Sequence, residues 1–226
     1  MSKQPSLRDR LKALVRSALD RQDPTGWFET LYAGAKGDSS KIPWAKLTPY
    51  PLLQDWLDRR DPPQPGQRAL VVGCGLGDDA EALQQLGYGV LAFDIAPTAI
   101  AWCQERFPNS SVTYQVGDLR NPAPDWIGAF DLVVECRNVQ ALPLSSRAQA
   151  LTALTQTVAP QGTLLVITHL RFSPEPPAGP PWPLSESELG QLGLEGFTEI
   201  DRKVTQIHSD PTAPPITQAW IEYQRH

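Results

Sequence analysis

The sequence predicts an α/β protein built on a doubly wound, mostly parallel sheet. Short apolar runs recur from Arg68 onward, and each of the first four is followed by a loop or helical stretch of ten or more residues. A glycine-rich turn follows the first run directly. Buried parallel strands show this pattern because helices cover both faces of their sheet. The expected strands are Ala69–Val72, Val90–Phe93, Val112–Val116, Phe130–Val134 and Thr163–Thr168.

The N-terminal residues 1–60 contain two expected helices and two unplaced tryptophans. The first helix has apolar residues at helical spacing among basic ones, which are Leu7, Leu11, Leu14, Val15, Ala18 and Leu19. It suits a packed or lid helix. An organelle transit peptide is the alternative, although Asp9 and Asp20 are unusual in one. Trp27 and Trp44 fall outside regular spacing, and a second helix is expected through residues 52–57.

The stretch at residues 61–66, Asp-Pro-Pro-Gln-Pro-Gly, predicts a rigid connector, because proline cannot continue a helix and glycine permits a turn. The main core therefore spans residues 66–226, and residues 1–60 are expected to belong to the same domain. Two late β-like runs, 197–207 and 216–223, have no room between them for a crossover helix. They are expected to pair antiparallel.

Composition excludes several classes of function. The net charge of −5 and pI near 5.2 lack the positive field that nucleic-acid binding needs, and no apolar run approaches the length of a membrane span. Cys74, Cys103 and Cys136 show no metal or redox spacing, and the three histidines are far apart. We expect a cytoplasmic protein with no metal, nucleic-acid or membrane partner, as a monomer or weak homodimer.

The turn after the first strand reads Gly73-Cys74-Gly75-Leu76-Gly77-Asp78-Asp79. In a dinucleotide-binding turn a third glycine stands at the sixth position, where this chain has Asp78. Two carboxylates at the N-terminus of a helix interact favourably with the helix dipole, but they repel a phosphate group. Close backbone approach at Gly73 and Gly75, with local negative charge, suits a nucleoside that carries cationic groups. S-adenosylmethionine fits this description.

Two further acidic positions follow the next strands. Asp94 lies seventeen residues after Gly77, close to the spacing at which a carboxylate accepts both ribose hydroxyls, and Ile95 follows it. After the third strand, Asp118 suits the adenine amino group and Leu119 the adenine ring. An acid after a strand is often only a helix cap. The three elements in this order and spacing predict a nucleoside site.

These residues resemble the class I S-adenosylmethionine-dependent methyltransferases. The resemblance covers residues 68–226, with Val-Val-Gly-Cys-Gly-Leu-Gly-Asp, Phe-Asp-Ile and Gly-Asp-Leu as its motifs. Trp27, Pro43 and Trp44 resemble, more loosely, the cap of the thiopurine methyltransferase-like and thiol or halide methyltransferase branch. The resemblance implies a seven-stranded Rossmann-like sheet of order 3-2-1-4-5-7-6 with strand seven antiparallel. It also implies an N-terminal helical cap, with both tryptophans near the cofactor.

Ligands of open α/β sheets bind beyond the carboxyl ends of the strands. Glu135 and Arg137 end the fourth strand, where Glu135 would stabilise the cationic end of the cofactor and Arg137 would hold an anionic or polar substrate. An ordinary solvated pair is the alternative. His169 ends the fifth strand and is a candidate base, with a hydrogen-bonded structural role as its alternative. Glu135 and Arg137 are the other catalytic candidates.

The proline-rich segment 173–184 follows the fifth strand. Its position favours an active-site wall with Trp182 facing the substrate, and a partner-binding segment is the alternative. The motifs typical of adenine and cytosine methyltransferases are absent from the sequence. The expected activity is methyl transfer to a small-molecule thiol, hydroxyl, amine or halide. The alternatives are a non-catalytic S-adenosylmethionine sensor or scaffold, and a nucleotide-dependent oxidoreductase that Asp78 disfavours.

Overall fold

A computed structural model describes residues 7–175, 179–208 and 214–226. The chain folds around one mixed sheet of strand order β3-β2-β1-β4-β5-β8-β7, and a two-residue strand, β6, pairs with β5 outside this path. Apart from β6, which the sequence analysis missed, the order is the one that the resemblance implied. The doubly wound fold is therefore confirmed.

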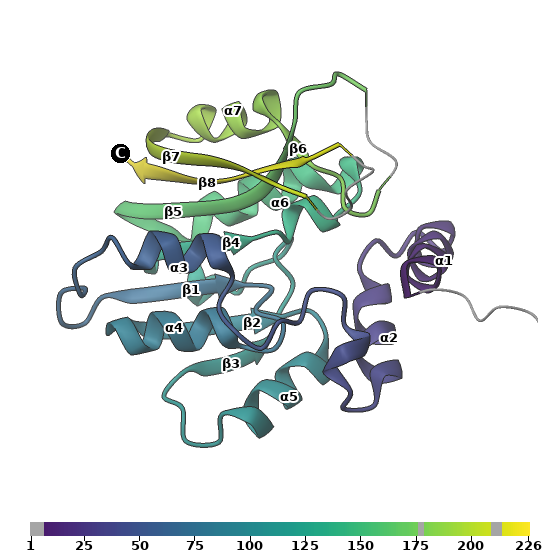
Figure 1. Ribbon diagram of the computed structural model, residues 1–226. Helices are drawn as coiled ribbons and strands as arrows, with labels where there is room; N and C mark the ends of the chain where they lie inside the picture. Colours follow the sequence, from purple (N-terminus) through teal and green to yellow (C-terminus); the bar gives the residue numbers. More distant parts are fainter. Residues whose placement is uncertain (1–6, 176–178, 209–213) are drawn as a thin grey trace, which may run out of the picture.

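The strands match the predicted apolar runs closely (Figure 1). β1, β2, β3, β4 and β5 are parallel neighbours, whereas β8 runs antiparallel to both β5 and β7. The expected antiparallel pair of late strands is confirmed, and residues 209–213 between them lie outside the described residues. The bounds are Arg68–Val72, Gly89–Asp94, Thr113–Val116, Phe130–Cys136, Val158–Arg171, Leu184–Ser185, Phe197–Ile207 and Ile216–Arg225 for β1 to β8.

Helices cover both faces of the sheet, because side chains alternate along each strand. In β1, Leu70 and Val72 face one core with α6 (Leu144–Thr157) and α7 (Glu186–Leu194). Ala69 and Val71 face the other core, with α3 (Pro51–Leu57), α4 (Asp78–Leu86) and α5 (Pro97–Arg106). The central strands β1, β2, β4 and β5 are thus buried on both sides over most of their length, as their continuous apolar sequence predicted. The edge strands β3 and β7 are mostly exposed, which corrects the expectation of a fully buried third strand.

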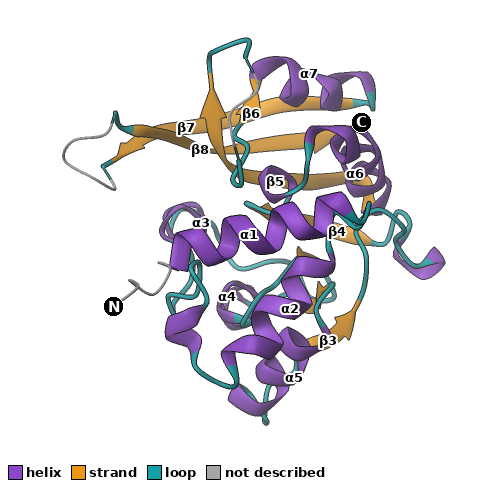
Figure 2. Ribbon diagram, turned by 90° about the vertical axis from the view of Figure 1, so that its right-hand side faces the viewer, coloured by secondary structure: helices purple, strands orange, loops and turns teal. Residues whose placement is uncertain are grey.

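The first two helices, α1 (Leu7–Asp20) and α2 (Gly26–Ala35), lie beyond the carboxyl ends of the parallel strands (Figures 1 and 2). They form a third apolar cluster with Leu76, Ala96 and Ala141, which come from the loops after β1, β2 and β4. Glu29 of α2 accepts hydrogen bonds from the backbone N–H and hydroxyl of Thr98, at 3.0 and 2.6 Å. Helix α2 is therefore attached to the first turn of α5.

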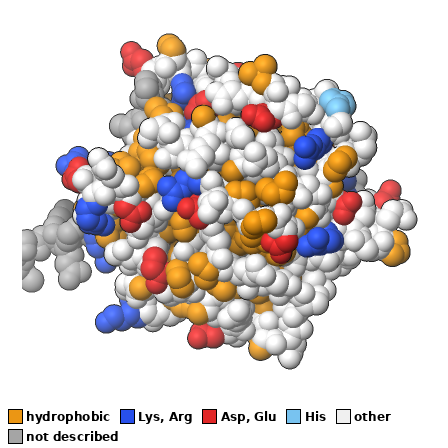
Figure 3. Space-filling view, turned by 180° about the vertical axis from the view of Figure 1, so that it is seen from behind, with side chains coloured by type: hydrophobic (Ala, Val, Ile, Leu, Met, Phe, Trp, Pro, Cys, Tyr) orange, Lys and Arg blue, Asp and Glu red, His pale blue; other side chains and the backbone are white. Residues whose placement is uncertain are grey.

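Basic and acidic side chains are interspersed on the face shown in Figure 3. Within the described residues, no helix is both long and apolar enough to cross a membrane. The same residues contain no group of three or more histidine, cysteine or acidic side chains arranged to hold a metal ion. The described residues therefore contain neither a membrane-spanning helix nor a cluster of metal ligands.

Candidate functional site

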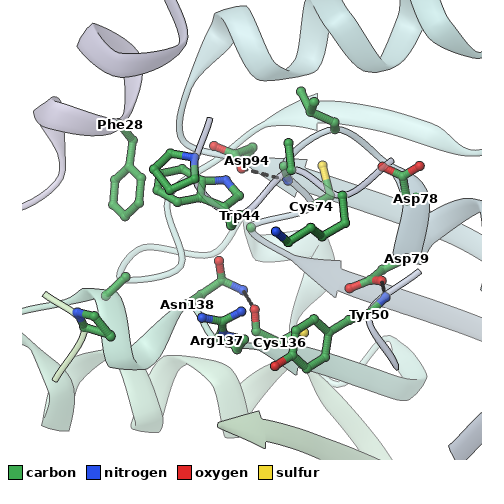
Figure 4. A pocket seen from close by; sticks show the side chains of 18 of the residues that line it. Phe28, Trp44, Tyr50, Cys74, Asp78, Asp79, Asp94, Cys136, Arg137 and Asn138 are labelled. Carbon is green, nitrogen blue, oxygen red and sulfur yellow. Dashed lines mark hydrogen bonds between the residues drawn. The ribbon is translucent and has the colours of Figure 1, made fainter. Parts of the chain in front are cut away.

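Two adjoining cavities open where the parallel strands end, and Figure 4 shows side chains that line the larger one. The larger has a volume of about 260 Å³ and the smaller about 60 Å³. Four residues line both cavities, which are Phe28, Gly73, Asp94 and Asn138. They come from α2, from the loop after β1, from the end of β2 and from the loop after β4. The cavities therefore meet at the carboxyl edge of the sheet, where the sequence predicted a ligand.

The glycine loop between β1 and α4 has a left-handed backbone. Gly73, Gly75 and Gly77 have φ angles of 55°, 56° and 91°. Residues with a Cβ atom seldom adopt such angles. A Cβ atom on Gly75 would lie 3.4 Å from the Tyr32 hydroxyl, on the side of the larger cavity. Glycine at position 75 thus permits the left-handed turn and keeps this part of the cavity wall free of a side chain.

Asp94 fixes the glycine loop and faces both cavities. Its Oδ2 accepts a hydrogen bond from the N–H of Gly75 at 3.0 Å, and its Oδ1 accepts one from the N–H of Ala96 at 2.9 Å. Burial raises the pKa of Asp94 to about 6, although these backbone hydrogen bonds act to lower it. Each carboxylate oxygen can accept a further hydrogen bond, so Asp94 retains acceptor capacity toward a ligand.

The smaller cavity contains the other predicted nucleoside residues, Ile95, Asp118 and Leu119. Asp118 accepts hydrogen bonds from the side chain of Arg120 at 2.7 and 3.0 Å. Burial raises the pKa of Asp118, but the hydrogen bonds from Arg120 outweigh burial and hold it below its ordinary value. Asp118 is therefore an ionised acceptor at the end of this cavity, with its charge shared by Arg120.

Asp78 and Asp79 begin α4, as predicted, but their carboxylates have different partners. Asp78 forms a two-pronged ion pair with Arg106 of α5, at 2.8 and 2.9 Å. Asp79 accepts the N–H of Tyr50 at 2.7 Å and lines the larger cavity. Burial raises the pKa of Asp79 to about 6. The local negative charge predicted for this turn is thus partly cancelled by Arg106, which sequence reasoning did not place here.

The aromatic residues of the N-terminal segment cover the glycine loop. The Trp44 ring packs edge-on against Trp27, Phe28 and Tyr32, with centroid distances of 6.0, 6.1 and 5.9 Å. Its Nε1 donates a hydrogen bond to the Tyr32 hydroxyl at 2.8 Å. All four line the larger cavity, although Trp27 is only 2% exposed and belongs mainly to the cap core. Trp44 is the tryptophan placed mostly on the cavity.

Arg137 lies on the opposite wall of the larger cavity, as Figure 4 shows. Its φ of 67° is left-handed, which is uncommon outside glycine. The guanidinium lies 5.1 Å from the centre of the Tyr50 ring, and its Nε is buried without a hydrogen-bond partner. No carboxylate of the described residues forms a salt bridge with it. Sequence analysis predicted Arg137 on this wall, but not its contact with Tyr50.

Glu135 and His169 are placed differently from the expectation that they contact a ligand. Neither is among the residues that line the two cavities. Glu135 is fully buried, and its Oε1 accepts the backbone N–H groups of Asn138 and Val139. Burial lowers the pKa of His169 to about 4, with Arg137 adding to the effect. Both lie behind the wall, because the chain turns after β4 and directs residues 136–141 toward the cavity instead.

Trp182 also lies behind this wall. The neighbouring Pro180 and Pro181 line the larger cavity. Trp182 instead packs against the third apolar cluster, which α1 and α2 form, and donates its backbone N–H to the Gln140 carbonyl at 2.8 Å. Residues 176–178 of the predicted wall lie outside the described residues. The remaining predicted residue, Cys74, is buried and lines the larger cavity.

Sequence reasoning missed Tyr50 and Gln140, both of which line the larger cavity. No spacing signal marks them as a group. Gln140 follows β4 closely, where a functional loop is expected, so its position was the only available signal. Tyr50 precedes α3 and reaches the site only because its backbone N–H and hydroxyl bind Asp79 and Gln218.

A family model described as a methyltransferase domain matches residues 69–162. The chain is 23% identical over 189 residues to 2-heptyl-1-hydroxyquinolin-4(1H)-one methyltransferase of Mycobacteroides abscessus, with 81% of each chain covered. It is 28% identical over 197 residues to probable thiol methyltransferase 2 of Arabidopsis thaliana, covering 84% of this chain and 83% of that protein. A ubiquinone biosynthesis O-methyltransferase of Xanthomonas campestris pv. campestris is 30% identical over 159 residues, which span 70% of this chain but 61% of the relative.

Solved structures share the fold. N-methyltransferase NodS from Bradyrhizobium japonicum, in complex with S-adenosyl-L-homocysteine, superposes with a TM-score of 0.64 at 18% identity, over 87% of this chain and 98% of that one. A structure from work on the conversion of a disulfide bond into a thioacetal group during echinomycin biosynthesis gives 0.67 at 22% identity, over 87% and 92% of the chains. At these identities the likeness is one of fold.

The sheet order, the glycine turn and the cavities at the strand ends define an α/β protein with a candidate ligand site at the carboxyl edge of its sheet. Together with the matched methyltransferase domain and the methyltransferase relatives, they identify the family. The chain is a class I S-adenosylmethionine-dependent methyltransferase, and S-adenosylmethionine is its cofactor. The comparisons thus favour an enzyme over the sensor and oxidoreductase alternatives.

Proposed function

We propose that this enzyme methylates an oxygen or sulfur nucleophile of a small molecule. The observation that carries the proposal is the shape of the larger cavity, which runs from the glycine loop to a second wall formed by residues 136–141 with Pro180 and Pro181. The aromatic side chains of the cap close it from above. A volume of about 260 Å³ suits a small ligand rather than a polymer. Relatives named for a hydroxyquinolone and for thiols support these nucleophiles.

The residues present fit the cofactor in a definite order along the two cavities. Ile95, Asp118 and Leu119 would hold the adenine in the smaller cavity. Asp94, at the junction, has acceptor capacity for the ribose hydroxyls. Gly73, Cys74 and Gly75 leave a smooth wall for the cationic tail, and Asp79 adds a carboxylate to the same cavity. This distribution of acidic groups suits a ligand that carries ammonium and sulfonium charges.

When bound, S-adenosylmethionine supplies an electrophilic methyl group. The protein's own contributions are alignment and exclusion of water. Trp44, Phe28 and Trp27 cover the glycine loop, while Arg137 and the two prolines face them across the cavity. His169 is buried behind the wall and its Nε2 has no hydrogen-bond partner. We therefore assign it a structural role and place no proton transfer on it.

We also propose that residues 1–60 form a helical cap integral to the domain built by residues 66–226. The shared apolar cluster and the Glu29–Thr98 hydrogen bonds support this arrangement. The enzyme would act as a monomer or weak homodimer, without nucleic acid or membrane. Light scattering of the purified chain tests the oligomeric state, and a stable higher oligomer would contradict it.

The direct test combines calorimetric titration of S-adenosylmethionine with measurement of S-adenosylhomocysteine release. The acceptor panel contains small thiols, phenols and N-hydroxy compounds, with amines and halides as comparison groups. We expect micromolar or tighter cofactor binding and product release with thiols or hydroxyl compounds. Release only with amines or halides would contradict the proposed nucleophile, and absence of cofactor binding would contradict the whole proposal.

A further inference from the structure

The wall opposite the glycine loop is built from hydrogen-bond donors. Arg137 and Gln140 both line the larger cavity at this wall, and each contacts the end of β5. The backbone N–H of Arg137 donates to the Ile167 carbonyl at 2.8 Å. Gln140 is 2% exposed, so it is a buried polar side chain on a cavity wall. Burying a polar side chain costs free energy unless it has a hydrogen-bond partner.

The amide of Gln140 has one fixed orientation. Its Oε1 accepts the backbone N–H of His169 at 2.7 Å and the Thr168 hydroxyl at 3.1 Å. The N–H of His169 fixes the oxygen end of the amide, and the Thr168 hydroxyl shares its one proton between this oxygen and the His169 carbonyl, which is 3.2 Å away. Because the oxygen is held by these donors, the NH₂ group is the part of the amide left to donate to a ligand in the cavity that Gln140 lines. Gln140 therefore offers hydrogen-bond donors, not acceptors, to a bound molecule.

Arg137 adds a positive charge to the same wall. Its Nε has no hydrogen-bond partner, and no salt bridge neutralises its guanidinium among residues 7–175, 179–208 and 214–226. The left-handed φ of 67° places an arginine where a glycine or asparagine is more usual. The Tyr50 ring supports the guanidinium from one face. His169 stays neutral behind it because burial lowers its pKa to about 4.

The acidic side chains and Arg137 thus lie on different walls of the cavity, and Lys46 adds a second positive charge to the lining from the segment before α3. Asp79 and Asp94 lie on the glycine-loop side, where the proposed function places a cationic cofactor. Arg137 and the Gln140 amide lie on the other side. We infer that the acceptor of this enzyme carries a carboxylate, or an equivalent anionic oxygen, which Arg137 and Gln140 bind together. This inference rests on the proposed function and narrows its substrate class.

An anion held by an arginine and an amide N–H accepts charge-assisted hydrogen bonds, which are stronger than neutral ones. Removing one such donor from a buried site typically weakens binding by tenfold or more. A neutral acceptor of the same shape would leave Arg137 desolvated and unpaired, and it would be disfavoured. The preference for the anion is therefore expected to depend on these two side chains and not on cavity shape.

The experiment measures binding to the full-length protein saturated with S-adenosylhomocysteine, so that no reaction interferes. The probes are benzoate, salicylate and 2-mercaptobenzoate, each compared with its neutral amide by calorimetry. We expect at least one acid to bind about tenfold or more tightly than its amide. Arg137→Gln is expected to remove most of this preference, while affinity for the amide stays within about twofold.

Gln140→Glu gives the second variant, because it keeps the acceptor for His169 and Thr168 but replaces the NH₂ group by an oxygen. At pH 8 it is expected to reverse the preference toward the amide. Arg202→Gln, which alters an arginine paired with Glu186 and Glu199 on β7, is the matched control and should retain the preference. Thermal unfolding of each variant checks that the fold is kept.

The inference is overturned if no acid in the panel binds more tightly than its amide, or if the preference survives in both Arg137→Gln and Gln140→Glu. Those results leave cofactor binding and product release untouched, so the proposed function would stand without it. If S-adenosylhomocysteine itself does not bind, the proposed function fails first. The same titrations on the free protein then still decide whether the wall selects carboxylates.

Discussion

The two walls of the larger cavity are encoded in different ways. The glycine-loop wall comes from short stretches directly after strands, at residues 73–79 and 94–95. The opposite wall is assembled from parts far apart in the chain, which are Tyr50, residues 136–141 and residues 180–181. The wall proposed to hold the cofactor is thus encoded by local sequence, whereas the wall proposed to hold the methyl acceptor depends on tertiary packing. The two walls should therefore respond separately to substitution.

The largest expected effect is on the glycine-loop wall, where the proposed function places the cofactor. Gly75→Val places a branched side chain at a φ of 56° and directs it toward the Tyr32 hydroxyl. Backbone strain of about 1–3 kcal/mol and blocked access act together. We expect cofactor affinity, measured by calorimetry, to fall by about 100-fold or more. Gly34→Ala, where a Cβ atom meets nothing within 4 Å, is the control. Near-normal affinity in Gly75→Val would show that the cofactor does not approach this loop.

Arg147→Met tests the other wall. Arg147 is 2% exposed and donates to the carbonyls of Leu142 and Trp182 and to Glu188 Oε1, the last at 2.7 Å. It thereby fixes Trp182 beside the two prolines that line the cavity. Removing one partner of a buried ion pair costs about 3 kcal/mol or more.

Chemical unfolding should show this loss, and the KM for the acceptor should rise while cofactor affinity stays within about twofold. Arg202→Met, on a partly exposed ion-pair network, should cost less than about 1 kcal/mol. Equal loss of cofactor and acceptor binding in Arg147→Met would contradict the separation of the two walls.

Asp94→Ala is the third test. Asp94 is 6% exposed and faces both cavities. Loss of hydrogen bonds to a charged acceptor should weaken cofactor binding by about 1.5–3 kcal/mol. Calorimetry on Asp94→Ala, beside the exposed Asp125→Ala, measures the difference. Unchanged affinity in a folded Asp94→Ala protein would remove the ribose assignment from this residue.

The raised pKa of Asp94 also predicts that the stability of the folded protein depends on pH. Burial raises the pKa of Asp94 from 3.8 to about 6, so the folded protein binds a proton more tightly than the unfolded chain. Stability contributed by this group is therefore present at low pH and declines as pH rises from about 4 to 6. The shift corresponds to about 3 kcal/mol.

Cofactor binding should follow the opposite direction, because ionised Asp94 is the better acceptor. Affinity should thus increase between about pH 5 and 7. Asp94→Asn should flatten both profiles when urea unfolding and calorimetry are repeated across this range. A variant with the same slopes as the natural protein would assign the pH dependence to other groups, among which are Asp79 and Glu135, whose pKa values burial raises to about 6 and about 7.

The fold was predictable because its signals are local. Apolar runs gave five strands within a few residues of their observed bounds, and a late antiparallel pair followed from the missing crossover. Asp94 was located by its distance from the glycine turn, and Asp118 by its position directly after the third strand. Arg106 escaped prediction because its pairing with Asp78 crosses two helices. Glu135 was expected to contact a ligand, but a strand-end carboxylate can equally cap the following loop, as Glu135 does for Asn138 and Val139.

The cap gives the smallest expected effect and the finest distinction. Trp44 and Trp102 both pack edge-on against the Tyr32 ring, at 5.9 and 6.1 Å, but only Trp44 lines the larger cavity. If the cap serves the cofactor, Trp44→Ala should weaken cofactor binding several-fold and speed its release. Trp102→Ala should remove a comparable ring contact without this effect.

Stopped-flow displacement of the cofactor measures release in both variants. Trp44→Phe keeps an aromatic face but loses the hydrogen bond to Tyr32, so it should lie between the natural protein and Trp44→Ala. This order follows because an aromatic face near a sulfonium attracts it, whereas the hydrogen bond only orients the ring. Equal effects of Trp44→Ala and Trp102→Ala would mean that the tryptophans merely attach the cap, and that the cofactor wall ends at the glycine loop.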